Sequence, residues 1–223
     1  MKILFITDNF PPETNAPSSR TYEHCLKWIN AGADVTVITC FPNFPLGIVF
    51  KGYKNSFRKI EDIDGIKVIR VWSFIHSNSG FFLRILDHLS FAISAFLNLI
   101  FIKKNSYDTI IATSPQFFVG LTASLISKTK KIPWFFEVRD LWPEGIIFLK
   151  RNSFPYKILL KLEEYYYNSS KGIITVTSSF KDDIVKRFNI PENKIEIVYN
   201  GSNLKLFQPQ IKSYNLVKKL KLQ

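Results

Sequence analysis

The sequence is poor in the residues from which disulfide frameworks and metal sites are built. Its 223 residues include two cysteines and three histidines. None of them stands in a CxxC or Cys/His spacing, so no structural zinc site and no metal centre are predicted. A disulfide-stapled secreted scaffold is also excluded, and the thiols are expected to be free and buried in a reducing compartment. The residues are Cys25, Cys40, His24, His76 and His88.

Two further signals are missing. No G-x-G-x-x-G fingerprint occurs, which argues against a dinucleotide-dependent dehydrogenase. The opening residues, MKILFITDNF, hold too short an apolar run before Asp8 for a signal-peptide core, and they fit a first strand better. We therefore expect a protein that is not secreted.

The composition is that of a globular protein, with 46% hydrophobic and 22% charged residues. The formal net charge of +12 suits an anionic partner, such as phosphate or anionic lipid, but a solvated basic surface explains it as well. The aromatic residues lie in apolar runs rather than between lysines, so nucleic-acid binding is not expected. Residues 205–223 contain no acid and carry Lys205, Lys212, Lys218, Lys219 and Lys221.

Seven short runs rich in β-branched and aromatic residues recur along the chain. They are nearly continuous rather than alternating, which is typical of parallel strands covered on both faces. Helical patterns separate several of them, so we predict a Rossmann-like, doubly wound α/β fold with a mostly parallel sheet. The expected strands are 2–7, 34–39, 66–72, 108–113, 133–138, 172–177 and 195–199.

The clearest helical pattern runs from Ser18 to Asn30, with Ser18 or Ser19 as its cap and Gly32 at its end. A second helix is expected after the strand at 108–113, with Ser114 as cap and Pro115 in the first helical position. Further helices are expected at 155–169 and 179–188.

The segment 81–104 has two interpretations. Its apolar-rich run, 89–102, is shorter than the ~20 residues that a membrane span needs. It could lie at a membrane surface with basic residues at its ends. Alternatively, it is a helix buried between the sheet and a neighbour, and periodicity alone does not separate the two.

Ligands of open parallel sheets bind beyond the carboxyl ends of the strands. The first such loop, DNFPPETNAPSSR, leads into a capped helix whose free N–H groups favour an anion, and Arg20 adds a guanidinium. A surface ion pair of Arg20 with Glu13 or Glu23 is the alternative. The second loop, CFPNFPLGIVFKGYK, is aromatic and suits a sugar ring, unless its phenylalanines, Phe41, Phe44 and Phe50, pack onto the domain.

The loop after the expected strand 133–138 reads FFEVRDLWPEG. It brings Glu137, Arg139, Asp140 and Glu144 within eight residues. A carboxylate at the carboxyl end of a strand could orient or deprotonate a substrate hydroxyl, while a guanidinium could hold an anion. The same residues could equally form a salt-bridged loop in which Arg139 neutralises Asp140.

Several stretches together resemble one family. KILFITDNFPPETNAPSSR, FPNFPLG followed by GYK, EDIDGIKVIRVW, TSPQF, FEVRDLWPE and ENKIEIVYNGSNLKLFQP occur in this order over about residues 1–210. They look like the N-terminal half of GT-B retaining glycosyltransferases of the family-four type, closest to transferases of bacterial surface-polysaccharide assembly, including the L-fucosamine transferases. RDLWPE together with YNG is the most specific part.

The resemblance implies an enzyme that transfers a sugar from a nucleotide-sugar, with UDP-sugar favoured, to a lipid-linked glycan, without metal or other cofactor. It implies a catalytic, acceptor-orienting role for Asp140, and a position near the donor phosphates for Asn15, Ala16 and Arg20. Pro17 replaces a phosphate-binding glycine and has no N–H to donate. Acceptor-binding roles are implied for Asn43, Arg139, Trp142 and Glu144.

The same resemblance divides the chain into an acceptor-binding domain, 1–207, and a basic linker, 208–223, leading toward a donor-binding domain that is absent and would be supplied in cis or in trans. The expected location is the cytoplasm, peripherally at the inner face of the membrane. A non-catalytic acceptor- or membrane-binding module, either an inactive fragment or a subunit of a split transferase, is the alternative.

Overall fold

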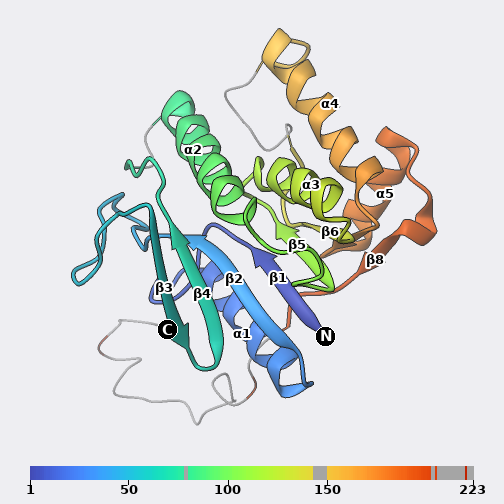
Figure 1. Ribbon diagram of the computed structural model, residues 1–223. Coiled ribbons are helices and arrows are strands. Elements are labelled where there is room, and N and C mark those ends of the chain that lie inside the picture. Colours follow the sequence, from blue (N-terminus) through green and yellow to red (C-terminus); the bar gives the residue numbers. More distant parts are fainter. Residues whose placement is uncertain (78–79, 143–149, 202–203, 205–218, 220–223) are drawn as a thin grey trace.

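A computed structural model describes residues 1–77, 80–142, 150–201, 204 and 219. These residues form one eight-stranded sheet in the order β3-β4-β2-β1-β5-β6-β7-β8 (Figure 1). All neighbouring strands pair in parallel except β3, which is antiparallel to β4. The strands are β1 Lys2–Ile6, β2 Asp34–Cys40, β3 Arg58–Ile63, β4 Ile66–Val71, β5 Thr109–Thr113, β6 Trp134–Val138, β7 Gly172–Thr175 and β8 Ile195–Ile197.

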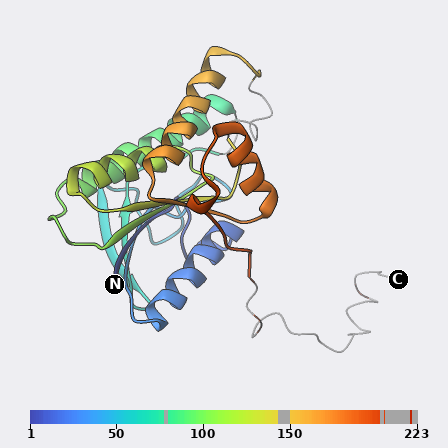
Figure 2. The same cartoon turned by 90° about the vertical axis from the view of Figure 1, so that its right-hand side faces the viewer.

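Helices cover both faces of the sheet (Figure 2). Of the helices in the described residues, α1 covers one face, and its Cys25 packs in a small core with Phe5 and Val37. The other face carries α2 to α5, and its larger core includes Phe91 of α2 and Ile184 of α5. The fold is therefore the doubly wound α/β architecture predicted from the sequence. The helices are α1 Ala16–Asn30, α2 Phe81–Leu99, α3 Val119–Lys130, α4 Phe154–Ser169 and α5 Ser178–Phe188.

One strand was not predicted. β3 reads RKIEDI and lies largely exposed at the edge of the sheet, so it lacks the apolar run by which the other strands were recognised. It joins β4 through a two-residue turn at Asp64 and Gly65, both with positive φ, 53° and 81°. This is the turn chemistry of a tight hairpin.

Two predicted helix starts were wrong. α1 begins at Ala16, and its cap is Asn15, whose side-chain oxygen accepts a hydrogen bond from the Ser18 N–H. α3 begins at Val119 rather than at Pro115, because the Ser114 hydroxyl is engaged elsewhere, by backbone N–H groups after β6. The predicted end of α1 is confirmed, since Gly32 follows it with φ +85°.

Candidate functional site

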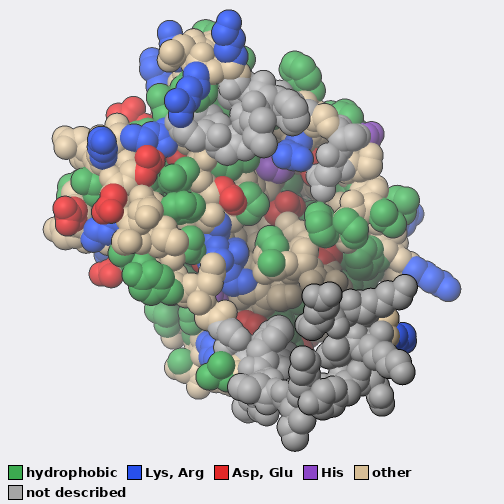
Figure 3. Space-filling view, turned by 180° about the vertical axis from the view of Figure 1, so that it is seen from behind, with side chains coloured by type: hydrophobic (Ala, Val, Ile, Leu, Met, Phe, Trp, Pro, Cys, Tyr) green, Lys and Arg blue, Asp and Glu red, His purple; other side chains and the backbone are tan. Residues whose placement is uncertain are grey.

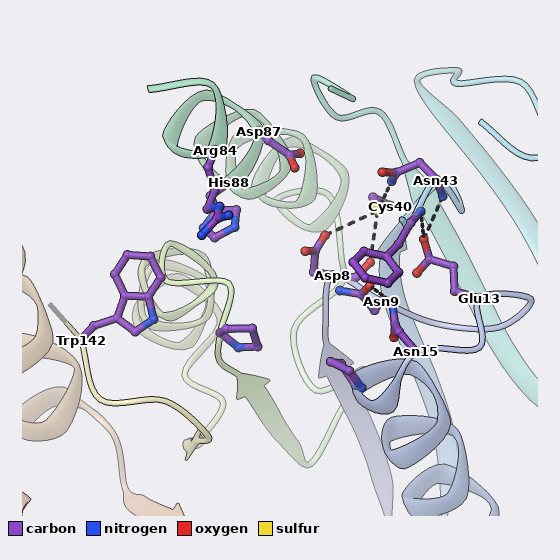
Figure 4. Close-up of a pocket in the computed structure, with 13 residues that line it drawn as sticks. Asp8, Asn9, Glu13, Asn15, Cys40, Asn43, Arg84, Asp87, His88 and Trp142 are labelled. Atoms are coloured by element: carbon purple, nitrogen blue, oxygen red, sulfur yellow. Dashed lines mark hydrogen bonds between the residues drawn. The ribbon is translucent and has the colours of Figure 1, made fainter. Parts of the chain in front are cut away.

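The carboxyl ends of β1, β2, β5 and β6 surround a pocket of about 240 Å³ (Figure 4). β1 lies between β2 and β5, so the loops that follow these strands diverge there, and such switch points hold ligands in open sheets. The N-terminal half of α2 closes the pocket from above the sheet. The lining residues are Asp8, Asn9, Glu13, Asn15, Pro17, Cys40, Asn43, Phe44, Arg84, Asp87, His88, Pro115 and Trp142.

Glu13 connects the two loops that form one wall of the pocket. It is 4% exposed, and its Oε1 accepts hydrogen bonds from the backbone N–H groups of Asn43 (2.8 Å) and Phe44 (2.9 Å). This wall is also anchored from below by Arg70, which is fully buried and donates to the carbonyl oxygens of Cys40 (3.0 Å) and Pro11. The loops after β1 and β2 are therefore fixed to each other and to the sheet.

Three carboxyl groups gather at the pocket. Burial raises the pKa of Asp8 to about 8, with further increases from the charges of Asp87 and Glu13. Burial, followed by the charge of Glu13, raises the pKa of Asp87 to about 6. Burial also raises the pKa of Glu13, although its backbone hydrogen bonds oppose this. At neutral pH the pocket can thus offer a protonated carboxyl group as a hydrogen-bond donor.

The opposite wall is aromatic. Trp142 stacks on Phe117 with ring centroids 5.0 Å apart, and its ring lies 6.0 Å from that of His88. Burial lowers the pKa of His88 to about 4, so its imidazole is neutral near pH 7. In Figure 4, His88 and Trp142 lie across the pocket from Asp8 and Asn9. Polar groups facing an aromatic wall can accommodate a ring with one apolar face and hydroxyl edges.

A second group lies beside the pocket, and we call Arg20, Glu137, Arg139 and Asp140 the arginine cluster. Glu137 is 5% exposed. It lies 3.2 Å from Arg139 (Oε1 to Nη1) and 4.0 Å from Arg20 (Oε2 to Nη2). Burial lowers the pKa of Arg20 to about 10, so the guanidinium is still charged at neutral pH. Burial raises the pKa of Asp140, with the charges of Arg139 and Arg20 acting in the opposite direction.

Ser114 and Asn200 hold the arginine cluster in place. The Ser114 hydroxyl accepts hydrogen bonds from the backbone N–H groups of Arg139 (2.7 Å) and Asp140 (3.2 Å). The Arg139 guanidinium also donates to the side-chain oxygen of Asn200. Asn200 belongs to the YNG stretch, so two motifs about 60 residues apart in the sequence meet here.

The residues expected at a site fall into both groups. Asn15, Asn43 and Trp142 line the pocket, and Arg20, Arg139 and Asp140 form the arginine cluster with Glu137. Ala16 is exposed at the first residue of α1. Glu144 lies outside the described residues, as does most of the basic linker 208–223.

Two ion pairs considered as alternatives, between Arg20 and Glu13 and between Arg139 and Asp140, give way to other contacts. Arg139 pairs with Glu137 rather than serving mainly to neutralise Asp140, and Glu13 bonds backbone amides rather than Arg20. Of the loop phenylalanines, Phe41 is fully buried, whereas Phe44 is 40% exposed and lines the pocket.

Sequence reasoning missed Asp8, Glu13, Asp87 and His88 as pocket residues. Asp8 directly follows the first predicted strand, and this position was the available signal. Glu13 lies in the quoted loop DNFPPETNAPSSR but was considered only as an ion-pair partner of Arg20, and Asp87 and His88 lie on a helix without a motif of their own. In the part of the chain that the structure describes, no group of three or more His, Cys, Asp or Glu side chains could hold a metal ion.

The comparisons with known proteins agree with this architecture. The sequence profile of Glycosyltransferase Family 4 matches residues 18–206. A solved structure of sucrose-phosphate synthase from Thermosynechococcus elongatus is similar, with a TM-score of 0.67 and 16% sequence identity. The match covers 100% of this chain and 53% of that one, so the chain spans about half of its length, one Rossmann-like half of a GT-B fold. No curated protein sequence matches.

Proposed function

Since the chain belongs to glycosyltransferase family 4, we propose that it is the acceptor-binding part of an enzyme that transfers a hexose-type sugar from a nucleotide-sugar to a lipid-linked glycan. The observation that carries the proposal is the pocket at the switch point of the sheet. There Asn43, Asn15 and Trp142 come together from three loops with the carboxyl groups of Asp8 and Asp87.

The acceptor sugar would lie with a ring face against Trp142 and its hydroxyl groups toward the carboxyl and amide groups of the opposite wall. Asp140, at the border of the arginine cluster, would accept a hydrogen bond from the reacting hydroxyl and orient it. Arg20 and Arg139 would lie near the departing diphosphate, whose negative charge grows as the glycosidic bond breaks. We further propose that the anomeric configuration is retained and that the reaction needs no metal.

The donor, for which we favour a UDP-sugar, would bind between this chain and a second, donor-binding domain. We place the enzyme in the cytoplasm, peripherally at the inner membrane face, in the assembly of a surface polysaccharide. The support for these finer points is the set of motifs RDLWPE and YNG, together with the basic charge of the chain.

The test is transfer of a radiolabelled sugar from UDP-sugars to a bacterial lipid extract, catalysed by this chain joined to or mixed with a donor-binding domain. Asp140→Asn should lower kcat about 100-fold, as expected for the loss of a group that positions or deprotonates a nucleophile. The matched control is Asp182→Asn, an exposed acid on α5. Equal turnover of the two variants would remove Asp140 from the mechanism.

A non-catalytic module that holds a lipid-linked acceptor is the second candidate. It is favoured by the formal net charge of +12 and by the apolar-rich segment 81–104, which both suit a membrane surface. In that case the isolated chain should bind the acceptor, and no donor-binding domain added in cis or in trans should produce transfer.

A further inference from the structure

α2 exposes apolar side chains on the face that points away from the sheet. Five of them follow one another at steps of three and four residues, so they form one stripe along the helix. They are Leu86, Leu89, Ile93, Leu97 and Ile100, the last of which caps the C-terminal end of α2. Ile93, in its middle, is 52% exposed. A helix that covers a sheet in water normally turns polar residues outward. We call these five residues the α2 stripe.

The inward face of the same helix is partly polar. Ser94 is 6% exposed and Asn98 is 8% exposed, and the Asn98 side-chain amide donates to the Ser94 carbonyl oxygen (2.9 Å). The C-terminal half of α2 thus turns both polar and apolar side chains inward, whereas its outward stripe is apolar. Exposure of the stripe is not a by-product of a helix that is apolar all round.

The surroundings of the stripe are basic. No charged residue occurs in 89–102, and the stripe continues into Phe101, which is 88% exposed, and then into exposed Lys103 and Lys104. Lys130 of α3 reaches the same end, where its ammonium group donates to the Ile100 carbonyl oxygen (2.6 Å). At the other end of the helix, exposed Arg84 lies three residues from Asp87, and both line the pocket, so the basic surroundings are confined to the C-terminal end.

Length and composition would let residues 82–99 cross a membrane, but 39% of this window is buried inside the protein. Phe91, Ala95 and Leu99 belong to the main core, so α2 is held against the sheet along its length. A spanning orientation would require these contacts to break. The exposed stripe can therefore contact a surface only with α2 lying along that surface, not passing through it.

We propose that the α2 stripe docks this chain on an anionic lipid bilayer, with α2 parallel to the membrane plane. Interfacial helices place apolar side chains in the headgroup boundary and basic residues beside it, as α2 does with its stripe and with Lys103 and Lys104. A second copy of this chain fits less well, because each copy has a formal charge of +12. The opposite side of the molecule, in Figure 3, mixes apolar, acidic and basic side chains instead.

The docking surface and the pocket share one helix. Arg84, Asp87 and His88 line the pocket from the N-terminal half of α2, while Leu86 and Leu89 lie on its outer face. Docking would hold the pocket mouth close to the lipid headgroups. The benefit for catalysis rests on the proposed function, since the sugar of a lipid-linked acceptor would lie at the headgroups, next to the pocket. The docking itself does not depend on it.

The experiment is vesicle flotation of the full 223-residue chain, without donor or acceptor. Vesicles of phosphatidylcholine alone are compared with vesicles containing phosphatidylglycerol, at low and moderate salt. We expect the chain to float with the anionic vesicles, and the double variant Ile93→Glu/Leu97→Glu to lose at least about tenfold in partitioning. Lys103→Gln/Lys104→Gln should lose about fivefold for each lysine on anionic vesicles only. Val198→Glu, at an apolar residue 49% exposed beyond β8, is the matched control and should float like the parent chain.

The proposal is overturned if the double variant floats like the parent chain, or if the parent chain does not float with anionic vesicles. It is also overturned if light scattering shows a dimer that the double variant abolishes while flotation is absent, because the stripe would then join two copies. Circular dichroism of each variant establishes that it is folded. Transfer to a water-soluble acceptor is measured separately, with the chain joined to a donor-binding domain. A joined chain that makes no product, while the 223-residue chain still floats, overturns the proposed function alone.

Discussion

The pocket and the arginine cluster lie at the same edge of the sheet, yet their electrostatics are opposite. In the pocket, burial and the charges of neighbouring carboxylates raise the pKa of Asp8 to about 8 and that of Asp87 to about 6. In the arginine cluster, Glu137 is flanked by Arg20 and Arg139, so its charged form is compensated. The edge thus has a pocket that suits an uncharged, hydroxyl-rich group, and beside it two guanidinium groups that suit an anion, as the proposed transfer would require.

The largest effect is expected from breaking the wall of the pocket at Arg70. Arg70→Met removes its hydrogen bonds to Cys40 and Pro11 and leaves Glu61 without its buried partner. The free energy of unfolding should fall by about 3–5 kcal/mol in urea denaturation. The control Arg58→Met, at an exposed position of β3, should change it by less than about 0.5 kcal/mol. A loss under about 1 kcal/mol for Arg70→Met would show that the loops hold without it.

Neutralising an acid of the arginine cluster should destabilise the protein, because the two arginines then lose a counter-charge. Glu137→Gln leaves Arg20 and Arg139, both partly buried, without their shared counter-charge. We expect a loss of about 2–4 kcal/mol of unfolding free energy at pH 8, measured by urea denaturation. Glu196→Gln, at an exposed acid on β8, is the control. An unchanged stability would mean that the two arginines do not depend on Glu137.

Neutralising an acid of the pocket should instead raise the free energy of unfolding at pH 8. The folded protein holds protons on Asp8 and Asp87 up to pH values of about 8 and about 6, whereas both acids titrate near 3.8 when unfolded. The stabilising contribution of each group is therefore complete below pH 4 and is lost as pH rises toward its folded pKa. Asp8→Asn should flatten this decline and raise stability at pH 8 by at least about 1 kcal/mol. Denaturation curves from pH 4 to pH 9 provide the measurement, and an equal slope in variant and parent would contradict the assignment.

The smallest effect is expected where the two regions meet. Ser114→Ala removes the acceptor for the N–H groups of Arg139 and Asp140, while the neighbouring Pro115 stays at the pocket. Stability should fall by about 1–2 kcal/mol. With a donor-binding domain joined to the chain, the proposed function predicts lower turnover with little change in acceptor KM, since the orientation of Asp140 is affected and the pocket is not. Ser178→Ala, at the first residue of α5, serves as the control for a serine that contacts neither region.

The sheet could be predicted from the sequence because most of its strands are largely buried apolar runs, and helices separate several of them. β8 was recognised by its isoleucines, although only Ile195 is buried. β3 could not, since its charged residues are stabilised by pairing with β4 rather than by burial. The start of α3 was misplaced for a related reason. Ser114 is a good capping residue, but a partner distant in sequence, the turn at 139–140, uses its hydroxyl.

The two regions differ in the same way. Most of the arginine cluster lies in one short stretch, 137–140, so the motif revealed it. The carboxyl groups of the pocket come from a strand end, a loop and a helix, and only the fold brings Asp8, Glu13 and Asp87 together. Their raised pKa values arise from burial, which local sequence does not report. The α2 stripe was predictable in part. Periodicity indicated an apolar helix, but it did not show which face of the helix is covered by the rest of the protein.

The central place of β1 has a consequence for synthesis on the ribosome. β1 pairs with β2 on one side and with β5 on the other, through residues such as Ile3 and Thr109. At roughly 5–20 residues per second, the second edge of β1 waits about 5–20 s for its partner strand to be made. Its hydrogen-bonding groups stay open to wrong partners for that time. Binding of a chaperone to the nascent chain should therefore be strongest before residue 113 emerges and weaken once β5 has docked.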